Sequence, residues 1–580
     1  MSKRLTRPIA IMAVIAIASL VFIGAGAYSA PSGKPSYLNG TYEGSAPSHG
    51  GELSVVVTVK KGKIADVVIR ATDSAGISDA AIVKLPAAII KAQAIEVDAI
   101  AGATETSEAI KAAVADALAG ATLYPVDKTI KTDVVVIGGG NAGLAAAVEA
   151  SLAGAKVILV EKMPFLGGNS IRAGGAYNAV DPARQIPQGI EDSIEKHYQQ
   201  TFEGGDKKAD PALVKTFVEG APEGITWLES LGMKFQPNVF TVLGALWPRS
   251  HAAVEPVGTG FINTLSRTAE SNGVRIMLET TADQILREDG RVTGIVVVDA
   301  SGKRIRINAK RGVVLATGGF AANKEMRQEY DPLITPNLGT TNHPGALGEG
   351  IVMAKKIGAA LVGMEYIQML PLGNPETGAL NGWVGFNVED FIYINKGGKR
   401  FVSEAERRDV MTQALIKQKD QFMFIVCDAH SMPTPQTKNS FNETAEELVK
   451  KGTAFSADSI EELAAKIGVD PAAFRATIDD YNRGIDSGVD SFGKKLLGSK
   501  IDKAPFYASP RVPTVHHTMG GVRIDTLARA IDEAGDVIPG LYAAGEVTGG
   551  IHGGNRLGGN AIADTIVFGR IAGKSVAAKK

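Results

Sequence analysis

The sequence predicts a mixed α/β fold, α+β overall, whose central unit is a Rossmann-like domain. A continuous apolar run at residues 134–137 is typical of a strand buried on both faces of a parallel sheet. A glycine-rich loop with G-x-G-x-x-G spacing begins at Gly138 and leads into an alanine-rich segment of helical pattern. A second apolar run, residues 157–160, ends at Glu161. Strand, loop, helix, strand and acid in this order indicate one βαβ unit.

Each part of this unit suits a dinucleotide. Glycines let the backbone turn tightly and approach a pyrophosphate, and the helix N-terminus offers N–H groups to it. The carboxylate at the end of the second strand accepts from a ribose hydroxyl. The motif by itself does not distinguish NAD from FAD. The residues predicted to contact the dinucleotide here are Gly138, Gly140, Asn141, Ala142, Gly143, Glu161 and Lys162.

Length and composition exclude several classes of function. The 580 residues suffice for three or four domain-sized units, and the formal net charge of −1 gives no reason to expect nucleic-acid binding. Cys427 is the single cysteine, which excludes an intramolecular disulfide, a cysteine-based metal cluster and a c-type haem site. No metal site is predicted. Cys427 follows an apolar run, so we expect a buried thiol.

The N-terminus has the pattern of a targeting segment. Lys3, Arg4 and Arg7 precede an uncharged apolar run over residues 9–27, and small residues continue to Ala30. Residues 1–30 are therefore predicted to be a secretory signal peptide, cleaved after Ala27 or Ala30. An uncleaved membrane anchor is the alternative, since the run is just long enough to span a bilayer. Either way we expect an exported protein with its body in the periplasm or otherwise outside the cytoplasm.

A small α+β unit is predicted at residues 36–125. Alternating apolar residues over 53–59, a Lys-Gly-Lys turn and the run 64–69 predict a β-hairpin, and helical patterns follow around 80–94 and 105–118. Between the helices the chain reads DAIAGATETS, from Asp98 to Ser107.

This unit resembles the FMN-binding domain of exported and membrane redox proteins. In that family a flavin transferase joins FMN through its phosphate to the threonine of a D-x-x-[ST]-G-A-T sequence. The resemblance implies that Thr104 carries FMN covalently as a phosphodiester, although Ala101 stands where Ser or Thr is usual. The alternative is that Thr104 is only the N-cap of the following helix.

Later glycine turns decide between the dinucleotides. One follows Glu161 closely, a second ends the apolar segment 311–320, and a third lies in 539–550, which reads as strand, turn and helix. The second and third turns lie far along the chain from the first βαβ unit, as expected where later segments return to bind the second half of FAD. This arrangement resembles the succinate dehydrogenase/fumarate reductase flavoprotein family, over residues 134–580. The resemblance implies non-covalent FAD, with further contacts from Gly168, Asn169, Ser170, Thr317, Gly318, Gly319, Gly545, Glu546, Asn560 and Ala561.

The same resemblance implies the domain order. The FAD-binding domain comprises residues 130–369 and 516–580. A capping domain, residues 370–515, is inserted between these parts and closes over the substrate in that family.

Three motif matches imply a reaction. Reduction of an activated C=C bond needs hydride at one carbon, a proton at the other and a grip on the substrate carboxylate. The family resemblance implies that Arg408 is the proton donor. If the motif is aligned one residue earlier, the neighbouring Arg407 has this role instead. His516 binds the carboxylate and Arg556 clamps it, because a guanidinium pairs bidentately with a carboxylate.

Departures from the family pattern concern the other end of the substrate. Leu370 stands where fumarate reductases usually have histidine, and Trp383 and Val384 replace a Thr-Glu pair. With Phe386 they predict an apolar end to the pocket, while His517 completes its polar end. We therefore expect a monocarboxylic 2-enoate with an apolar or aromatic substituent, such as acrylate, methacrylate or a cinnamate, since an unpaired second carboxylate is unfavourable there.

Several alternatives stay open at this level. The main hypothesis is a respiratory ene-reductase in which electrons pass from a membrane quinol-linked or cytochrome donor through FMN to FAD. Urocanate reduction is retained because Glu389 or Asp390 could reach an imidazole, and fumarate is disfavoured. A dehydrogenase such as a ketosteroid dehydrogenase and a non-catalytic electron-transfer protein are the other classes. The acid that reprotonates Arg408 is one of Glu404, Glu406 and Glu389.

Overall fold

The computed structural model describes residues 36–48, 51–70, 79–385 and 387–578. The predicted signal peptide and Phe386 lie outside these residues. Within them, no helix combines the length and the apolar character needed to cross a bilayer.

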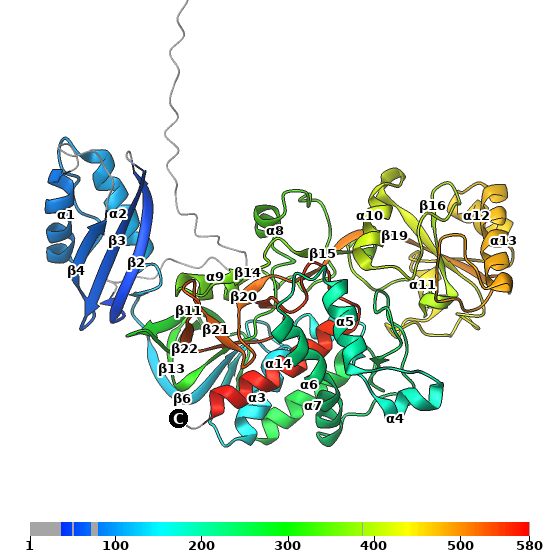
Figure 1. The fold of residues 1–580 in the computed structure, drawn as a ribbon, viewed down its shortest axis with the longest axis horizontal. Coiled ribbons are helices and arrows are strands. Elements are labelled where there is room, and N and C mark those ends of the chain that lie inside the picture. The colour runs from blue at the N-terminus through cyan, green and yellow to red at the C-terminus, as the bar shows by residue number, and fades with distance from the viewer. Residues whose placement is uncertain (1–35, 49–50, 71–78, 386, 579–580) are drawn as a thin grey trace, which may run out of the picture.

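The N-terminal unit is a three-stranded antiparallel sheet with two helices (Figure 1). The strands are β2 (Gly40–Ser48), β3 (Gly51–Lys60) and β4 (Lys63–Arg70), and the helices are α1 (Asp79–Ala92) and α2 (Thr104–Leu118). Leu53, Val55, Val57 and Val59 are buried on one face of β3, as their alternation predicts. The predicted hairpin is confirmed by the β3–β4 pairing.

The central unit is a mixed sheet in the order β10-β7-β6-β13-β12-β11, with β22 pairing beside the last residues of β13. Its strands are β6 (Lys128–Ile137), β7 (Val157–Val160), β10 (Arg275–Met277), β11 (Thr281–Glu288), β12 (Arg291–Val298), β13 (Arg304–Leu315), β21 (Arg529–Ile531), which pairs with β22, and β22 (Val537–Ala543). β6, β7, β10, β13 and β22 run parallel where they pair, so their carboxyl ends meet at one edge.

Helices α3 (Asn141–Leu152) and α14 (Asn560–Ala577) pack closely against each other beside this sheet (Figure 1). A side chain at Gly573 would place its Cβ 2.4 Å from the carbonyl oxygen of Ala146, so glycine is required for this approach. The other α-helices of the unit are α4 (Pro182–Gln185), α5 (Ile194–Gly204), α6 (Pro211–Ser230), α7 (Thr259–Ser271), α8 (Lys324–Tyr330) and α9 (Glu349–Lys356).

One prediction for the C-terminal segment is wrong. Residues 539–550 form the strand β22 and a turn, but the next element is the short strand β23 (Thr548–Gly549), and helix α14 begins only at Asn560. Residues 549–559 contain six glycines (Gly549, Gly550, Gly553, Gly554, Gly558 and Gly559), which disfavour a helix. The resulting loop carries Arg556.

A second sheet lies at the opposite end of the molecule from the N-terminal unit (Figure 1). It has the order β15-β19-β17-β16, with β18 also pairing with β19. These strands are β15 (Ile367–Gly373), β16 (Ile392–Asn395), β17 (Met423–Cys427), β18 (Phe455–Ala457) and β19 (Phe506–Thr518), and the helices are α10 (Arg408–Ile416), α11 (Ala445–Lys450), α12 (Ile460–Ile467) and α13 (Pro471–Ser487). Cys427 is fully buried in β17, as predicted, and burial raises the pKa of its thiol.

Candidate active site

A narrow groove of about 130 Å³ lies at the carboxyl ends of β6 and β7. The Glu161 carboxylate accepts the backbone N–H groups of Gly139 and Met163, each at 2.8 Å, which orients it at the strand end. A Cβ at Gly143 would lie 1.9 Å from the carbonyl oxygen of Gly138, so the loop and helix can approach only without a side chain. The groove is the one that the G-x-G-x-x-G spacing predicts.

The residues of this groove fit FAD. The amide nitrogen and oxygen of fully buried Asn141, and the Thr317 hydroxyl, have no hydrogen-bond partner within the described part of the chain. Buried polar groups are normally hydrogen-bonded, so a polar ligand is expected there. The groove shares lining residues with a larger cavity of about 590 Å³, which makes room for a ligand longer than a mononucleotide; the shared residues are Asn169, Ser170, Glu546 and Thr565.

Most of the other residues predicted to contact the dinucleotide line one of these two cavities. Those that line the groove are Gly138, Gly140, Ala142, Lys162, Gly168, Gly318 and Gly545. Ala561 lines the larger cavity. Gly143, Gly319 and Asn560 line neither, and the Asn560 side chain is engaged by Asn178 and Thr201.

The larger cavity brings Arg408, His516 and Arg556 together from three distant segments. Arg408 is the first residue of α10, His516 lies in β19, and Arg556 lies in the glycine-rich loop before α14. A Cβ at Gly244 or Gly558 would lie 2.8 Å from the Arg408 Cγ and 3.1 Å from its Nη2 respectively. Glycines therefore make room for the Arg408 side chain.

One neutral acceptor serves both arginines. The Gln368 Oε1 accepts from Arg408 Nη1 at 3.3 Å and from Arg556 Nη2 at 3.0 Å. Gln368 Nε2 in turn donates to the Asn555 Oδ1 at 2.9 Å. Sequence reasoning missed Gln368. Gln368 lies two residues before Leu370 in the same strand, and residues i and i+2 of a strand share a face. The prediction of Leu370 as a pocket residue therefore also indicated Gln368.

The two guanidiniums are buried without a paired charge. Neither forms an ion pair with a carboxylate among the residues that the structure describes; Arg408 donates otherwise to the carbonyl of Leu243, and Arg556 to that of Leu557. Burial, and then repulsion by Arg556, hold the pKa of Arg408 well below its usual value. Burial lowers the pKa of Arg556 to about 10, although Glu546 and Asp564 oppose the shift. Uncompensated buried charge favours binding of an anion.

Two histidines complete this end of the cavity. His516 Nδ1 lies 2.8 Å from the Thr341 hydroxyl, and His517 Nδ1 lies 3.6 Å from a Glu546 oxygen. Burial is the largest cause that lowers the pKa of each, and both arginines add to it. Both imidazoles are therefore neutral at pH 7, and each can donate or accept a hydrogen bond according to its tautomer.

Arg407 and the three acids considered for reprotonation of Arg408 do not line the cavity. Arg407 is ion-paired with Asp206 at 2.7 Å and with Asp409 at 2.8 Å. Glu406 is exposed. Glu389 keeps one buried oxygen without a partner, and burial raises its pKa.

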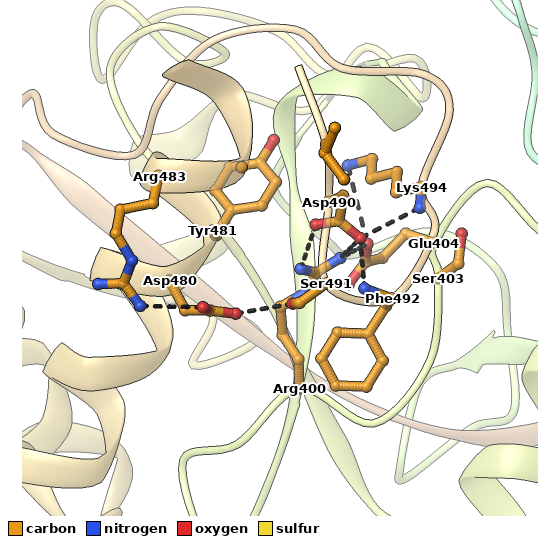
Figure 2. Close-up of polar contacts among 12 residues, drawn as sticks. Arg400, Ser403, Glu404, Asp480, Tyr481, Arg483, Asp490, Ser491, Phe492 and Lys494 are labelled. Carbon is orange, nitrogen blue, oxygen red and sulfur yellow. Dashed lines mark hydrogen bonds and ion pairs between the residues drawn. The ribbon is translucent and has the colours of Figure 1, made fainter. Parts of the chain in front are cut away.

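Glu404 belongs to a buried ionic network in the second sheet unit (Figure 2). It accepts from Arg400 at 2.8 Å, Arg400 also pairs with Asp490 at 2.6 Å, and Lys494 lies 3.8 Å from Glu404. Lys494 donates to the carbonyl oxygen of Phe391 at 2.8 Å. Because Phe391 lines the cavity, the network holds a backbone segment that forms part of the cavity wall.

Part of the cavity wall is apolar. Leu370 and Trp383 line it together with Leu372, Leu380, Val388 and Phe391. The Trp383 and Phe391 rings meet edge to face, with their centroids 5.8 Å apart. Val384 is fully buried but does not line the cavity.

Thr104 lies in the N-terminal unit as the first residue of α2. The N-cap is Ala103, without a side-chain cap, so the alternative interpretation of Thr104 as the N-cap is wrong. Thr104 is exposed. The neighbouring Gly102 has φ +84°, and a Cβ added there would meet no atom within 4 Å, so the loop before Thr104 is not packed against another segment at this point.

Fold and site together define a flavoprotein with two flavin sites, and comparison with known proteins agrees. Residues 133–562 match the FAD binding domain, and residues 49–119 match the FMN-binding domain. The chain is 35% identical to the urocanate reductase of Eggerthella lenta over 93% of its own length and 92% of that protein. It is 37% identical to the fumarate reductase (cytochrome) of Shewanella frigidimarina, covering 77% of each. The open form of a flavocytochrome c3 fumarate reductase superposes with a TM-score of 0.62 at 36% identity, covering 78% of each chain.

The chain belongs to the family of FAD-dependent flavoproteins that contains the fumarate and urocanate reductases, and its cofactors are FAD and covalently bound FMN. It is also 38% identical to the NADH:acrylate oxidoreductase of Vibrio harveyi and 39% identical to the NADH:fumarate oxidoreductase of Klebsiella pneumoniae. It spans 61% and 57% of the length of these two relatives.

Proposed function

We propose that this protein reduces the C=C bond of a monocarboxylic 2-enoate. The observation that carries the proposal is the pair of buried guanidiniums, Arg408 and Arg556, which share the neutral oxygen of Gln368 in a cavity continuous with the FAD groove. A substrate carboxylate supplies the negative charge that this pair lacks.

Each polar residue then has a role. Arg556 and neutral His516 hold the carboxylate, and a bidentate guanidinium pairing orients the conjugated C=C bond. FAD, when bound, supplies the hydride. Arg408 supplies the proton to the other carbon, and its lowered pKa makes it a stronger acid than a free guanidinium.

The apolar part of the cavity wall supports a substrate with one carboxylate. Leu370 offers no hydrogen bond and Trp383 offers only its indole N–H, so neither supplies a positive charge to a second carboxylate, and a buried carboxylate without a counter-charge is unfavourable by several kcal/mol. We therefore expect acrylate, methacrylate or a cinnamate to be preferred over fumarate. The names of relatives include acrylate, fumarate and urocanate reductases, so all three belong in the test.

Electrons are proposed to enter at FMN, carried on exposed Thr104 by the action of a flavin transferase. A donor linked to membrane quinol, or a cytochrome, suits an exported protein with residues 1–30 as its signal peptide or anchor. One relative is named a cytochrome fumarate reductase, which supports a cytochrome donor. Residues 370–515 are proposed to act as the cap over the substrate.

The test of the reaction uses purified holoenzyme reduced by a viologen dye. Acrylate, methacrylate, cinnamate, fumarate, urocanate, a 3-ketosteroid and oxygen are offered in turn. We expect reoxidation by monocarboxylic enoates and its loss in Arg408→Ala, with Arg407→Ala retaining it. Loss of reoxidation in Arg407→Ala but not in Arg408→Ala would assign the role of proton donor to Arg407. Reoxidation by the steroid alone, or by nothing offered, would refute the proposal.

A separate test concerns FMN. In protein produced together with its flavin transferase, one FMN should remain attached after denaturation, and Thr104→Ala should release it all. Thr106→Ala is the matched control from the same helix turn, and it should retain the flavin. Release of all flavin from the unsubstituted protein would contradict the covalent link at Thr104.

A further inference from the structure

The short turn that carries Trp383 is held by polar side chains from separate segments of the second sheet unit. Residues 381–383 lie in the connection between strand β15 and strand β16, and Trp383 lines the apolar part of the cavity wall. The side chains that hold this turn are Arg511, Asn439, Glu443 and Ser509. The turn is part of no regular strand or helix, so these contacts decide its conformation.

Arg511 makes the most unusual of these contacts. Its side chain is fully buried in β19 and donates to the carbonyls of Asn381, at 3.2 Å, and of Gly382. Burial lowers its pKa to about 9, and Glu443 opposes this shift. Burying a guanidinium whose hydrogen-bond acceptors are mainly neutral carbonyl groups costs free energy, because no opposite charge compensates it. Its rigid fork is suited to hold two successive carbonyls in one orientation.

The other contacts engage the remaining backbone groups. Asn439 Nδ2 donates to the Trp383 carbonyl at 2.8 Å, and Glu443 accepts the Gly382 N–H at 2.8 Å. The Val384 N–H donates to the Ser509 hydroxyl at 3.0 Å. Gly382 has φ +85°, a conformation that other residues adopt only with strain. The backbone on both sides of the Trp383 side chain is therefore fixed.

A fixed backbone gives the indole a defined place. Trp383 is 6% exposed and meets Phe391 edge to face, so both rings border the cavity in one geometry. Asn439 itself also lines the cavity, next to the wall that it supports. A flat apolar substituent gains contact from a rigid aromatic wall, whereas a small substrate does not reach it.

We propose that Arg511, Asn439 and Glu443 are positioning residues that clamp the 381–383 turn, so that Trp383 selects enoates with a flat apolar substituent. The inference rests on the proposed function for its substrate class. The clamp itself is a property of the protein alone.

The experiment compares Asn439→Asp with the unsubstituted holoenzyme. Aspartate keeps the oxygen that accepts the N–H groups of Phe441 and Glu443, but it can donate neither to the Trp383 carbonyl nor to the Glu443 carboxylate, which Asn439 Nδ2 contacts at 3.1 Å, so two contacts of the clamp are lost together. We expect kcat/KM for cinnamate to fall about tenfold or more through KM, and kcat/KM for acrylate to stay within about twofold. Arg511→Lys, which keeps the charge but loses the fork, should act in the same direction.

Asn482→Asp is the matched control. Asn482 likewise bridges a backbone segment of the same unit, donating to the Ile501 carbonyl at 3.0 Å and accepting its N–H at 2.8 Å, but it does not line the cavity. It should leave the cinnamate to acrylate ratio unchanged. Equal losses on both substrates in Asn439→Asp, or no loss, would overturn the inference.

Hydrogen exchange separates the clamp from the reaction. Backbone amides of residues 381–384 should exchange faster in Asn439→Asp and in Arg511→Lys than in Asn482→Asp. If the enzyme reduces no enoate, the proposed function fails, and this exchange still decides the clamp. Unchanged exchange at the turn would refute the clamp even if enoates are reduced.

Discussion

Two clusters of buried cations, one around Arg400 and one around Arg408, differ in whether the chain supplies their counter-charge. Arg400 and Lys494 are buried beside Glu404 and Asp490, with the Arg400 ion pairs at 2.6 and 2.8 Å (Figure 2). Arg408 and Arg556 are buried too, but they share only the neutral oxygen of Gln368. The first cluster supplies its own counter-charge, and the second requires one from a ligand. Buried charge compensated by carboxylates of the chain, as at Arg400, or held by backbone carbonyls away from the cavity, as at Arg511, indicates structure. Buried charge that is left uncompensated in a cavity wall, as at Arg408 and Arg556, indicates a binding site.

The largest expected effect separates activity from stability at the uncompensated cluster. Arg408→Met should lower kcat/KM for an enoate by about 10²–10⁴-fold, the range for loss of a general acid. The free energy of unfolding should stay equal or rise, because an unpaired buried charge is replaced by an apolar chain of similar length. Viologen-coupled assays and urea unfolding measure the two quantities. A large loss of stability would show that the Arg408 charge is compensated after all.

The compensated cluster should respond in the opposite way. Glu404→Gln leaves Arg400 and Lys494 with less counter-charge, and loss of one partner of a buried pair typically destabilises by about 3–5 kcal/mol. The exposed pair of Glu461 and Arg475 offers the control, and Glu461→Gln should leave stability nearly unchanged because solvent screens the pair. Unfolding by urea measures both. Equal effects of the two substitutions would contradict the distinction drawn between buried and exposed pairs.

The smallest expected effect is the pH dependence of stability near the uncompensated cluster. The pKa values of His516 and His517 are lowered in the folded state, so below about pH 6.5 the unfolded state binds more protons. Stability should therefore fall as the pH drops below about 6.5, by up to about 1.4 kcal/mol per pH unit for each histidine. His516→Asn should reduce this slope. An unchanged slope in that variant would show that His516 does not titrate differently in the two states.

Local patterns predicted much of the fold. The apolar runs at β6 and β7 and the alternation in β3 indicated strands correctly. A strand buried on both faces is continuously apolar, and a strand buried on one face alternates between apolar and polar residues. The helix expected directly after β22 was wrong, since the glycine content of residues 549–559 outweighs the turn pattern before it. The loop found instead carries Arg556 to the cavity.

The site was predictable where a residue stands in a recognisable motif. Arg408, His516 and Arg556 were named from their motifs, and they line one cavity. Gln368 was indicated only indirectly, by its place two residues before Leu370 in β15, and the residues that hold the Trp383 turn stand in no motif. Arg511 and Asn439 lie 128 and 56 residues from Trp383 along the chain, and only the folded chain shows that they hold its turn.

The sequence by itself determined the two flavin-binding units, the family and the residue types available for the reaction, because these depend on local spacing and composition. Only the tertiary structure decided which charges are compensated. Glu404 lies four residues from Arg408, yet its carboxylate pairs with Arg400, and Arg408 meets Gln368 and Arg556 instead. Whether a buried charge finds a partner depends on distances between segments far apart in the chain, and no local pattern encodes those distances.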